Sequence, residues 1–263
     1  MLSDPLVLAL LGTGFSFLGT AAGAAMVYLL KKDVNVSLNR AFMGFASGVM
    51  IAAAVWSLML PALSMAQEQG MAPWAPAAAG FLFGGVFLFA LDKLMPHLHA
   101  GSDRPEGLSS SFKRTTMLVL AVTLHNIPEG MAVGLSFALA AREGSSVTLA
   151  GAAALALGMA LQNFPEGAAI SLPLRKEGFS RTKAFAWGAM SGIVEPVAGV
   201  LGVVLALTIV HVMPYMLSFA AGAMIYVVID ELVPSAYNEH SNAGTLAAMV
   251  GFVLMMILDL ALG

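Results

Sequence analysis

The sequence predicts an all-α fold, a polytopic transmembrane bundle of eight helices, on the basis of three observations. Of the 263 residues, 59% are hydrophobic and 10% are charged, whereas a soluble domain carries about a quarter charged residues. The apolar residues gather in eight runs of roughly 20 residues, the length with which a helix crosses a bilayer. The basic residues collect between alternate pairs of these runs.

The apolar runs give the predicted spans, which together form one transmembrane domain over residues 1–263. In chain order they cover residues 5–30, 40–64, 74–95, 115–140, 147–173, 183–208, 212–235 and 243–262. The first run is not a secretory signal, because Lys31 and Lys32 follow it instead of preceding it. Glycines spaced four apart, Gly19 with Gly23 and Gly80 with Gly84, indicate close helix packing in lipid.

The basic residues predict the orientation of the bundle. If the N-terminus lies outside, the outside loops hold only Arg142. The inside loops then hold Lys31, Lys32, Arg40, Lys93, Arg104, Lys113, Arg114, Arg175, Lys176, Arg181 and Lys183. Cytoplasmic loops carry such an excess of Lys and Arg. We therefore expect a multi-pass protein of the cell (inner) membrane, with both termini outside the cytosol and the loop over 96–111 inside.

Cysteine content and charge exclude several classes of function. The chain has no cysteine, which excludes disulfides, thiolate metal sites and thiol redox chemistry. Its net charge is −3 and it has no basic cluster with interleaved aromatic residues, so we expect no nucleic-acid partner.

Three carboxylates lie in the middle of predicted spans: Glu129, Glu166 and Glu195. An ionisable residue at the bilayer centre costs about 2.5–3.5 kcal/mol on insertion scales. These groups must therefore offset one another, take up protons or face a cation. A hydrogen-bond network that only joins helices is the alternative, although intramembrane ionisable residues usually mark a functional site.

A repeated motif surrounds two of these carboxylates. The fourth predicted span contains His125-Asn126-Ile127-Pro128-Glu129-Gly130, and the fifth contains Gln162-Asn163-Phe164-Pro165-Glu166-Gly167. At about 100° per residue, Glu129 lies between His125 and Asn126 on one face of its helix, and Glu166 lies in the same way between Gln162 and Asn163 on the fifth span. If these two helix faces are opposite each other, both glutamates can bridge two ions about 3.5–4 Å apart. The motif thus indicates a possible binuclear metal site, and the two prolines predict helix kinks at its depth.

At these residues the sequence resembles the ZIP family (Zrt/Irt-like metal transporters), and within it the bacterial GufA-type branch, over essentially the whole chain. The resemblance implies uptake of divalent metal into the cytosol, a 3+2+3 helix arrangement, elevator-like alternating access and a homodimer. Zinc is the expected substrate. Because amides stand at Gln162 and Asn163, where many relatives have histidine or an acid, we expect weaker binding and selectivity that extends to Fe²⁺ and Mn²⁺, with Cd²⁺ as a further candidate.

The resemblance also assigns site residues. The first metal site would contain His125, Glu129, Gln162 and Glu166. The second would contain Asn126, Glu129, Asn163, Glu166 and Glu195. Met50 and Ser57 match positions near the outer entrance, although Met50 could equally pack in the core. Asp92, Asp230 and Glu231 match the exit region, where a solvated helix end is the alternative. The pair His97 and His99 could bind zinc weakly or be part of a solvated loop.

Two other classes of function use similar residues. A zinc hydrolase needs about three firm protein ligands, commonly histidines, with an activated water. The spans contain one central histidine, His125, and no H-E-x-x-H motif, so we expect neither an enzyme nor a bound cofactor. A metal exporter or an ion channel would use the same ligands, and the sequence leaves those alternatives open.

Overall fold

The computed structural model describes residues 4–29, 36–94, 114–142, 144–145, 147–237 and 241–262, and these residues form helices and no strand. The helices are α1 (Pro5–Ala24), α2 (Met26–Leu29), α3 (Val36–Ala53), α4 (Leu60–Glu68), α5 (Trp74–Leu94), α6 (Arg114–Ala140), α7 (Leu149–Lys176), α8 (Arg181–Met190), α9 (Val194–Thr208), α10 (Met213–Val227), α11 (Val233–Ala236) and α12 (Ala243–Leu262). Two π-helical turns, η1 (Ala54–Met59) and η4 (Val228–Leu232), and two 3₁₀ turns, η2 (Ser191–Ile193) and η3 (Val210–Val212), complete the described helical structure.

Several of these elements join end to end into long helical segments. Within the described residues, six segments are long and apolar enough to cross a membrane: 5–29, 36–68, 74–94, 181–208, 213–236 and 243–262. Helices α6 and α7, with 27 and 28 residues, extend about 40 Å at 1.5 Å per residue. The all-α polytopic membrane fold is thereby confirmed. The eight-span count and the side on which the termini lie stay predictions.

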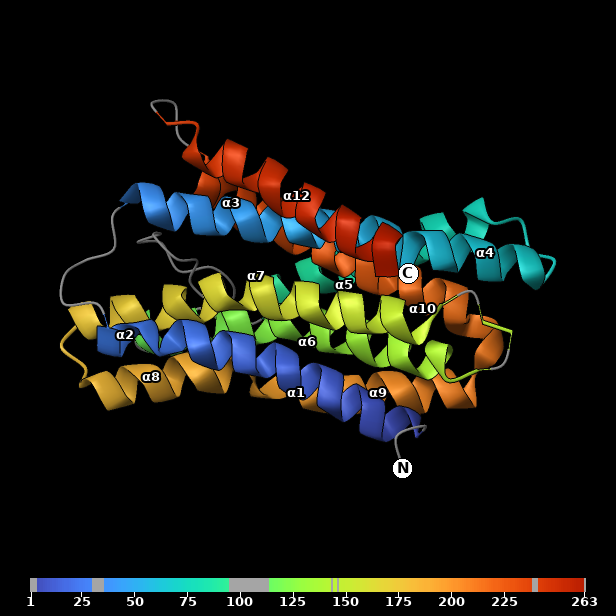
Figure 1. Cartoon of the computed structure of the whole chain (residues 1–263), viewed down its shortest axis with the longest axis horizontal. Helices are drawn as coiled ribbons and strands as arrows, with labels where there is room; N and C mark the ends of the chain where they lie inside the picture. The colour runs from blue at the N-terminus through green and yellow to red at the C-terminus, as the bar shows by residue number, and fades with distance from the viewer. Residues whose placement is uncertain are drawn as a thin grey trace.

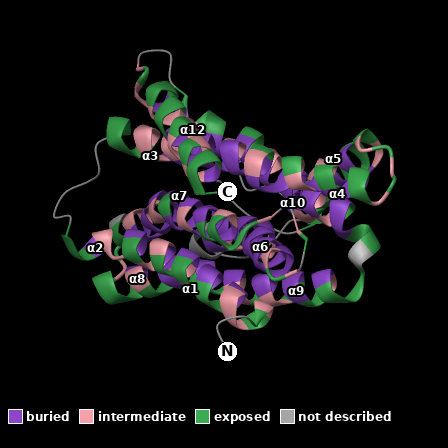
Figure 2. Cartoon of the chain, turned by 45° about the vertical axis from the view of Figure 1, so that its right-hand side comes forward, coloured by how far each residue is buried: buried purple, intermediate pink, exposed green. Residues whose placement is uncertain are grey.

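The helices form two groups that face each other (Figure 1). In the first group, which contains α1, α2 and α6–α9, α1 packs on α7 and α6 packs on α9. In the second group, which contains α3–α5 and α10–α12, α3 packs on α12 and α5 packs on α10. Helices α6 and α7 also contact α10, α3 and α12 of the second group, and Figure 2 shows both helices largely buried. The helices that carry the polar motif thus lie at the boundary between the groups.

Glycines allow the backbones within each group to approach closely. A Cβ atom at Gly19 or Gly23 of α1 would collide with backbone atoms of α7, and one at Gly80 or Gly84 would collide with α10. Small residues at such contacts let helices pack in lipid, where the hydrophobic effect does not drive them together. The packing role predicted for these glycine pairs is confirmed.

The Gly23→Ala substitution tests this contact. The added methyl group would meet the carbonyl oxygen of Phe164, so we expect the unfolding free energy to fall by about 1–3 kcal/mol, as for other overpacked sites. Gly14→Ala on the same helix is the matched control, because its Cβ would meet no atom within 4 Å. Thermal unfolding of both variants in detergent is the measurement. Equal midpoints for the two variants would contradict the proposed contact.

Candidate metal centre

The motif residues of α6 and α7 lie inside the bundle together with the glutamate of α9. Each of their side chains is at most 5% exposed. They are His125, Asn126, Glu129, Gln162, Asn163, Glu166 and Glu195. The structure therefore places all three mid-span carboxylates in the interior, where a polar group needs a partner to offset its lost hydration.

The two motifs meet through Glu129 and Gln162. The Nε2 atom of Gln162 donates a hydrogen bond of 2.6 Å to Oε2 of Glu129. The same nitrogen also contacts Oδ1 of its neighbour Asn163. Since the first bond runs from α7 to α6, it holds the two motif helices in register at the depth of the carboxylates.

Asn163 and Glu195 form a second polar contact, which includes α1. The Nδ2 atom of Asn163 donates to Oε1 of Glu195 and to Oγ of Ser16, both at 2.9 Å. The hydroxyl of Thr20 donates to the same glutamate oxygen at 3.4 Å. Ser16 and Thr20 are not among the site residues predicted from the sequence. The available signal was their four-residue spacing, which puts two polar side chains on one face of an apolar helix.

His125 contacts Glu231, a residue that the family resemblance assigns to the exit region. The Nδ1 atom of His125 lies 2.6 Å from Oε2 of Glu231, whose side chain is buried. Its neighbour Asp230 is exposed, because adjacent residues of a helix point in directions about 100° apart. The structure thus separates the two acids that the sequence grouped together, and it brings Glu231 into contact with His125 of the candidate metal centre.

Irregular helical turns occur close to these residues. Glu231 lies in the π-helical turn η4, ahead of Pro234, and the 3₁₀ turn η2 ends two residues before Glu195, which Pro196 follows. A proline cannot donate to the carbonyl four residues earlier, which weakens the α-helical ladder at these points. Such turns often mark functional positions. By contrast, α6 and α7 continue as α-helices through Pro128 and Pro165.

Five side-chain oxygens of the centre are buried without a hydrogen-bond partner. They are Oδ1 of Asn126, Oε1 of Glu129, Oε1 of Gln162, Oε2 of Glu166 and Oε2 of Glu195. Asn126 uses its Nδ2 atom to donate to the Ser191 carbonyl at 3.1 Å, which leaves its oxygen available. Buried polar atoms without a partner are rare, and carboxylate and amide oxygens beside an imidazole are suitable ligands for divalent metals.

A metal ion at this candidate centre would need amide oxygens among its ligands. In the described part of the chain, no three His, Cys, Asp or Glu side chains are grouped so that they could hold a metal ion by themselves. Glu129, Glu195 and His125 each contact a different partner, namely Gln162, Asn163 and Glu231. Ligation by this centre therefore requires oxygens of Asn126, Gln162 or Asn163, or a rearrangement of these contacts.

The other predicted residues lie elsewhere. Met50 is fully buried in the hydrophobic core, which fits the packing role that the sequence left open. Ser57 donates to Asp259 at 2.6 Å. Asp92 is buried near the C-terminal end of α5. His97 and His99 fall outside the described residues.

The Asn163→Asp substitution tests whether the Asn163 amide stabilises Glu195. It replaces a hydrogen-bond donor with a second carboxylate, so like charges would face each other in a buried site. We expect a lower unfolding temperature in metal-free buffer and a larger stabilisation by added zinc than in the unmodified protein, because an ion that binds only the folded state stabilises it. Thermal unfolding with and without zinc is the measurement. A zinc-induced shift that does not increase would contradict the assignment.

Fold and centre together define a class of protein: a multi-pass α-helical membrane protein whose interior contains oxygen and imidazole donors suited to divalent metal ions. The sequence model of the family described as ZIP Zinc transporter matches residues 97–259. The chain is 37% identical to Zinc transporter ZIP11 of Homo sapiens, over 97% of each chain. It is 38% identical to Zinc transporter GufA of Myxococcus xanthus, over 93% of this chain and 96% of that protein.

A third relative is Zinc transporter ZIPB of Bordetella bronchiseptica, which is 38% identical over 97% of this chain and 81% of that protein. The chain belongs to the ZIP family of zinc transporters. The resemblance inferred from the paired motif is confirmed.

Proposed function

We propose that this protein takes up divalent transition-metal ions, zinc foremost, into the cytosol by alternating access through the centre on α6 and α7. The observation that carries the proposal is the set of five buried oxygens without a hydrogen-bond partner on three neighbouring helices. A structural network would satisfy these atoms, whereas a cation needs them available. Family membership supports the class of cargo.

The centre is proposed to be binuclear, with shared carboxylates. The observed bonds of Gln162 to Glu129 and of Asn163 to Glu195 support a division into two sites. In each bond, an amide nitrogen approaches one carboxylate oxygen while the other oxygen has no partner. One ion would use His125, Glu129, Gln162 and Glu166. The other would use Asn126, Glu129, Asn163, Glu166 and Glu195.

Release of the ion is proposed to involve Glu231. Its carboxylate comes from the second group of helices and contacts His125 of the first. An ion that binds His125 at Nδ1 must displace the Glu231 carboxylate from this nitrogen. When the carboxylate returns to His125, it displaces the ion and helps it to leave. Binding is thus coupled to a contact between the two groups, as alternating access requires. Asp92 and Asp230 are proposed to continue the path to the cytosol.

The remaining features follow the same proposal. The protein would lie in the cell (inner) membrane with both termini outside, arranged as 3+2+3 helices, and would assemble as a homodimer. The basic residues of the loops support this orientation. Figure 1 shows both termini away from the end at which α7 is followed by α8.

Zinc influx into liposomes that contain a zinc-sensitive dye tests the main proposal. We expect saturable influx for the unmodified protein and a loss of about tenfold or more for Glu166→Gln, since even outer-shell partners of metal ligands contribute 10–100-fold. Glu68→Gln is the matched control, because Glu68 is exposed at the end of α4. Competition by Fe²⁺, Mn²⁺ and Cd²⁺ would rank the substrates. Full influx with Glu166→Gln would show that the site is wrongly assigned.

The Glu231→Gln substitution tests the proposed release step. A neutral amide competes less well for His125 than a carboxylate does, because charge-assisted hydrogen bonds are about twice as strong as neutral ones. We expect tighter zinc binding and slower release, so both KM and the maximal rate of uptake should fall several-fold. Uptake kinetics over a range of zinc concentrations give both values. A higher KM would indicate instead that Glu231 only helps the ion to bind.

A further inference from the structure

Two hydroxyl groups of α1 lie beside the glutamate that α9 contributes to the candidate metal centre. Ser16 and Thr20 are both 0% exposed, and Thr20 donates to Oε1 of Glu195 at 3.4 Å. The Nδ2 atom of Asn163 lies 2.9 Å from Oε1 of Glu195 and 2.9 Å from the Ser16 hydroxyl. Because Ser16 accepts from Asn163, its own hydrogen can donate to Glu195, with which it forms a further hydrogen bond. Three donors therefore surround Glu195, and two of them come from a helix without the paired motif.

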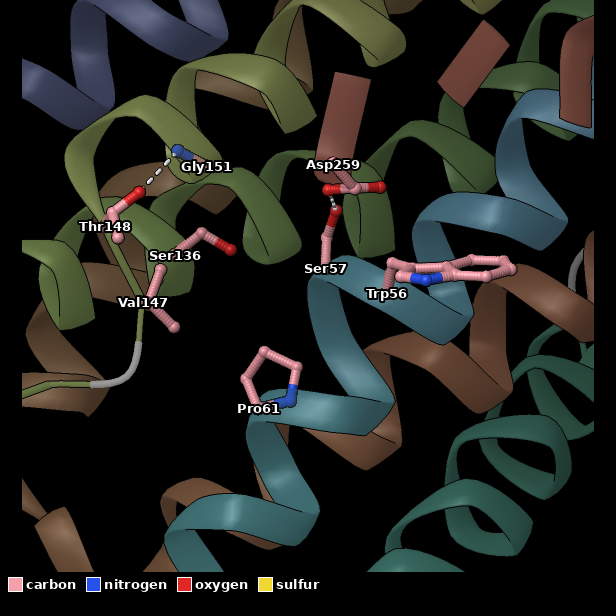
Figure 3. A pocket seen from close by; sticks show the side chains of 8 residues that line it. All are labelled: Trp56, Ser57, Pro61, Ser136, Val147, Thr148, Gly151 and Asp259. Atoms are coloured by element: carbon pink, nitrogen blue, oxygen red, sulfur yellow. Dashed lines mark hydrogen bonds between the residues drawn. The ribbon is translucent and has the colours of Figure 1, made fainter. Parts of the chain in front are cut away.

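These donors give the two oxygens of Glu195 different roles. Asn163 and Thr20 both donate to Oε1, whereas Oε2 is buried without a hydrogen-bond partner among the described residues. A carboxylate has about four lone-pair sites on its two oxygens, so two donors occupy those of Oε1. Asp259 shows a simpler form of this division, because Ser57 donates to its Oδ1 at 2.6 Å while its Oδ2 has no such partner (Figure 3). An ion at the centre can therefore bind Glu195 through one oxygen, Oε2.

Close packing holds the hydroxyls against the carboxylate. A Cβ atom at Gly192 would lie 2.9 Å from Oγ1 of Thr20 and 3.1 Å from Oε1 of Glu195. A Cβ atom at Gly167 would lie 1.9 Å from the carbonyl oxygen of Thr20. The two glycines thus leave room for donor and acceptor side by side between α1, α7 and α9. If Glu195 turned to present both oxygens to an ion, buried hydroxyls would lose their acceptor, which costs free energy.

The number of carboxylate oxygens that a site offers affects which ions it binds. Zinc takes about four ligands, with carboxylate oxygens at about 2.0–2.2 Å. Calcium takes about six to eight oxygens at about 2.3–2.6 Å, and some of its carboxylates bind through both oxygens. A glutamate that offers one oxygen therefore favours the smaller ion with fewer ligands.

We propose that Ser16 and Thr20 are positioning residues that determine specificity, because they keep Glu195 to one-oxygen coordination and so favour zinc over Ca²⁺. Both residues act through Glu195 and do not bind the ion themselves. Helix α1 thus contributes to the selectivity of the centre without supplying a ligand. This inference rests on the proposed function, since it concerns an ion at the same centre.

Calorimetric titration of the purified protein with zinc, with and without competing Ca²⁺, tests the proposal. The relevant ion is the one whose binding is lost in Glu195→Gln. We expect Ser16→Ala and Thr20→Val each to lower the ratio of the Ca²⁺ Kd to the zinc Kd, and the double variant to lower it by about tenfold, in the range seen for outer-shell partners of metal ions. The single variants carry the test if the double variant does not fold. An unchanged ratio in the variants that fold would overturn the proposal, as would zinc binding that Glu195→Gln leaves intact.

Two further variants separate selectivity from a purely structural role. Thr20→Ser keeps the hydroxyl and should keep the ratio of the unmodified protein. Thr13→Val is the matched control, because Thr13 is also buried on α1 but donates to the Ala9 carbonyl at 2.7 Å. A purely structural role would weaken both ions alike and leave the ratio unchanged, which would overturn the proposal.

Zinc influx into liposomes distinguishes this inference from the proposed function. A shifted ratio without influx in the unmodified protein would support the role of Ser16 and Thr20 and contradict transport. Saturable influx with an unchanged ratio would support transport and contradict the role of the two hydroxyls.

Discussion

Three carboxylates buried inside a membrane bundle impose the constraint on which the rest of the structure depends. An ion is poorly stabilised in a medium of low dielectric constant, so each charge needs donors, protons or a cation close by. The structure supplies amide donors to Glu129 and Glu195, from Gln162 and Asn163. Both glutamates nevertheless keep one oxygen without a partner. The polar interior is therefore partly satisfied by the protein, and a divalent ion would supply the missing interactions.

Close helix packing explains how the third carboxylate reaches the centre. A Cβ atom at Gly130, the residue after Glu129, would collide with the backbone of Glu195. A Cβ atom at Gly167, the residue after Glu166, would likewise collide with the backbone of Thr20. The glycine that ends each motif therefore permits a close helix contact beside the centre. It lets α9 approach α6 and lets α1 approach α7, and these approaches bring Glu195 and its hydroxyl donors to the site.

The sequence could predict the features that depend on residues close together in the chain. Apolar runs predicted a membrane bundle, and the repeated motif predicted which helices hold the polar residues, because both signals depend on residues close together in sequence. The partners Ser16, Thr20 and Glu231 come from other helices, so only tertiary packing reveals them. The π-helical turns were also missed, since one extra residue in a turn leaves no periodic signal. Both Asp230 and Glu231 lie in η4, and their adjacent positions on the helix leave Asp230 exposed and Glu231 buried.

The distribution of contacts between the two groups supports a carrier in which the ligands move together. The hydrogen bonds of Gln162 to Glu129, Asn163 to Glu195 and Asn126 to Ser191 all join helices of the first group. One contact from this centre to the second group is the pair of His125 and Glu231. If the first group moves against the second, the ligand set can keep its geometry while contacts such as this pair are exchanged. An ion that takes the place of the carboxylate at His125 must offset the loss of this buried contact, so ion binding is linked to the contact between the two groups.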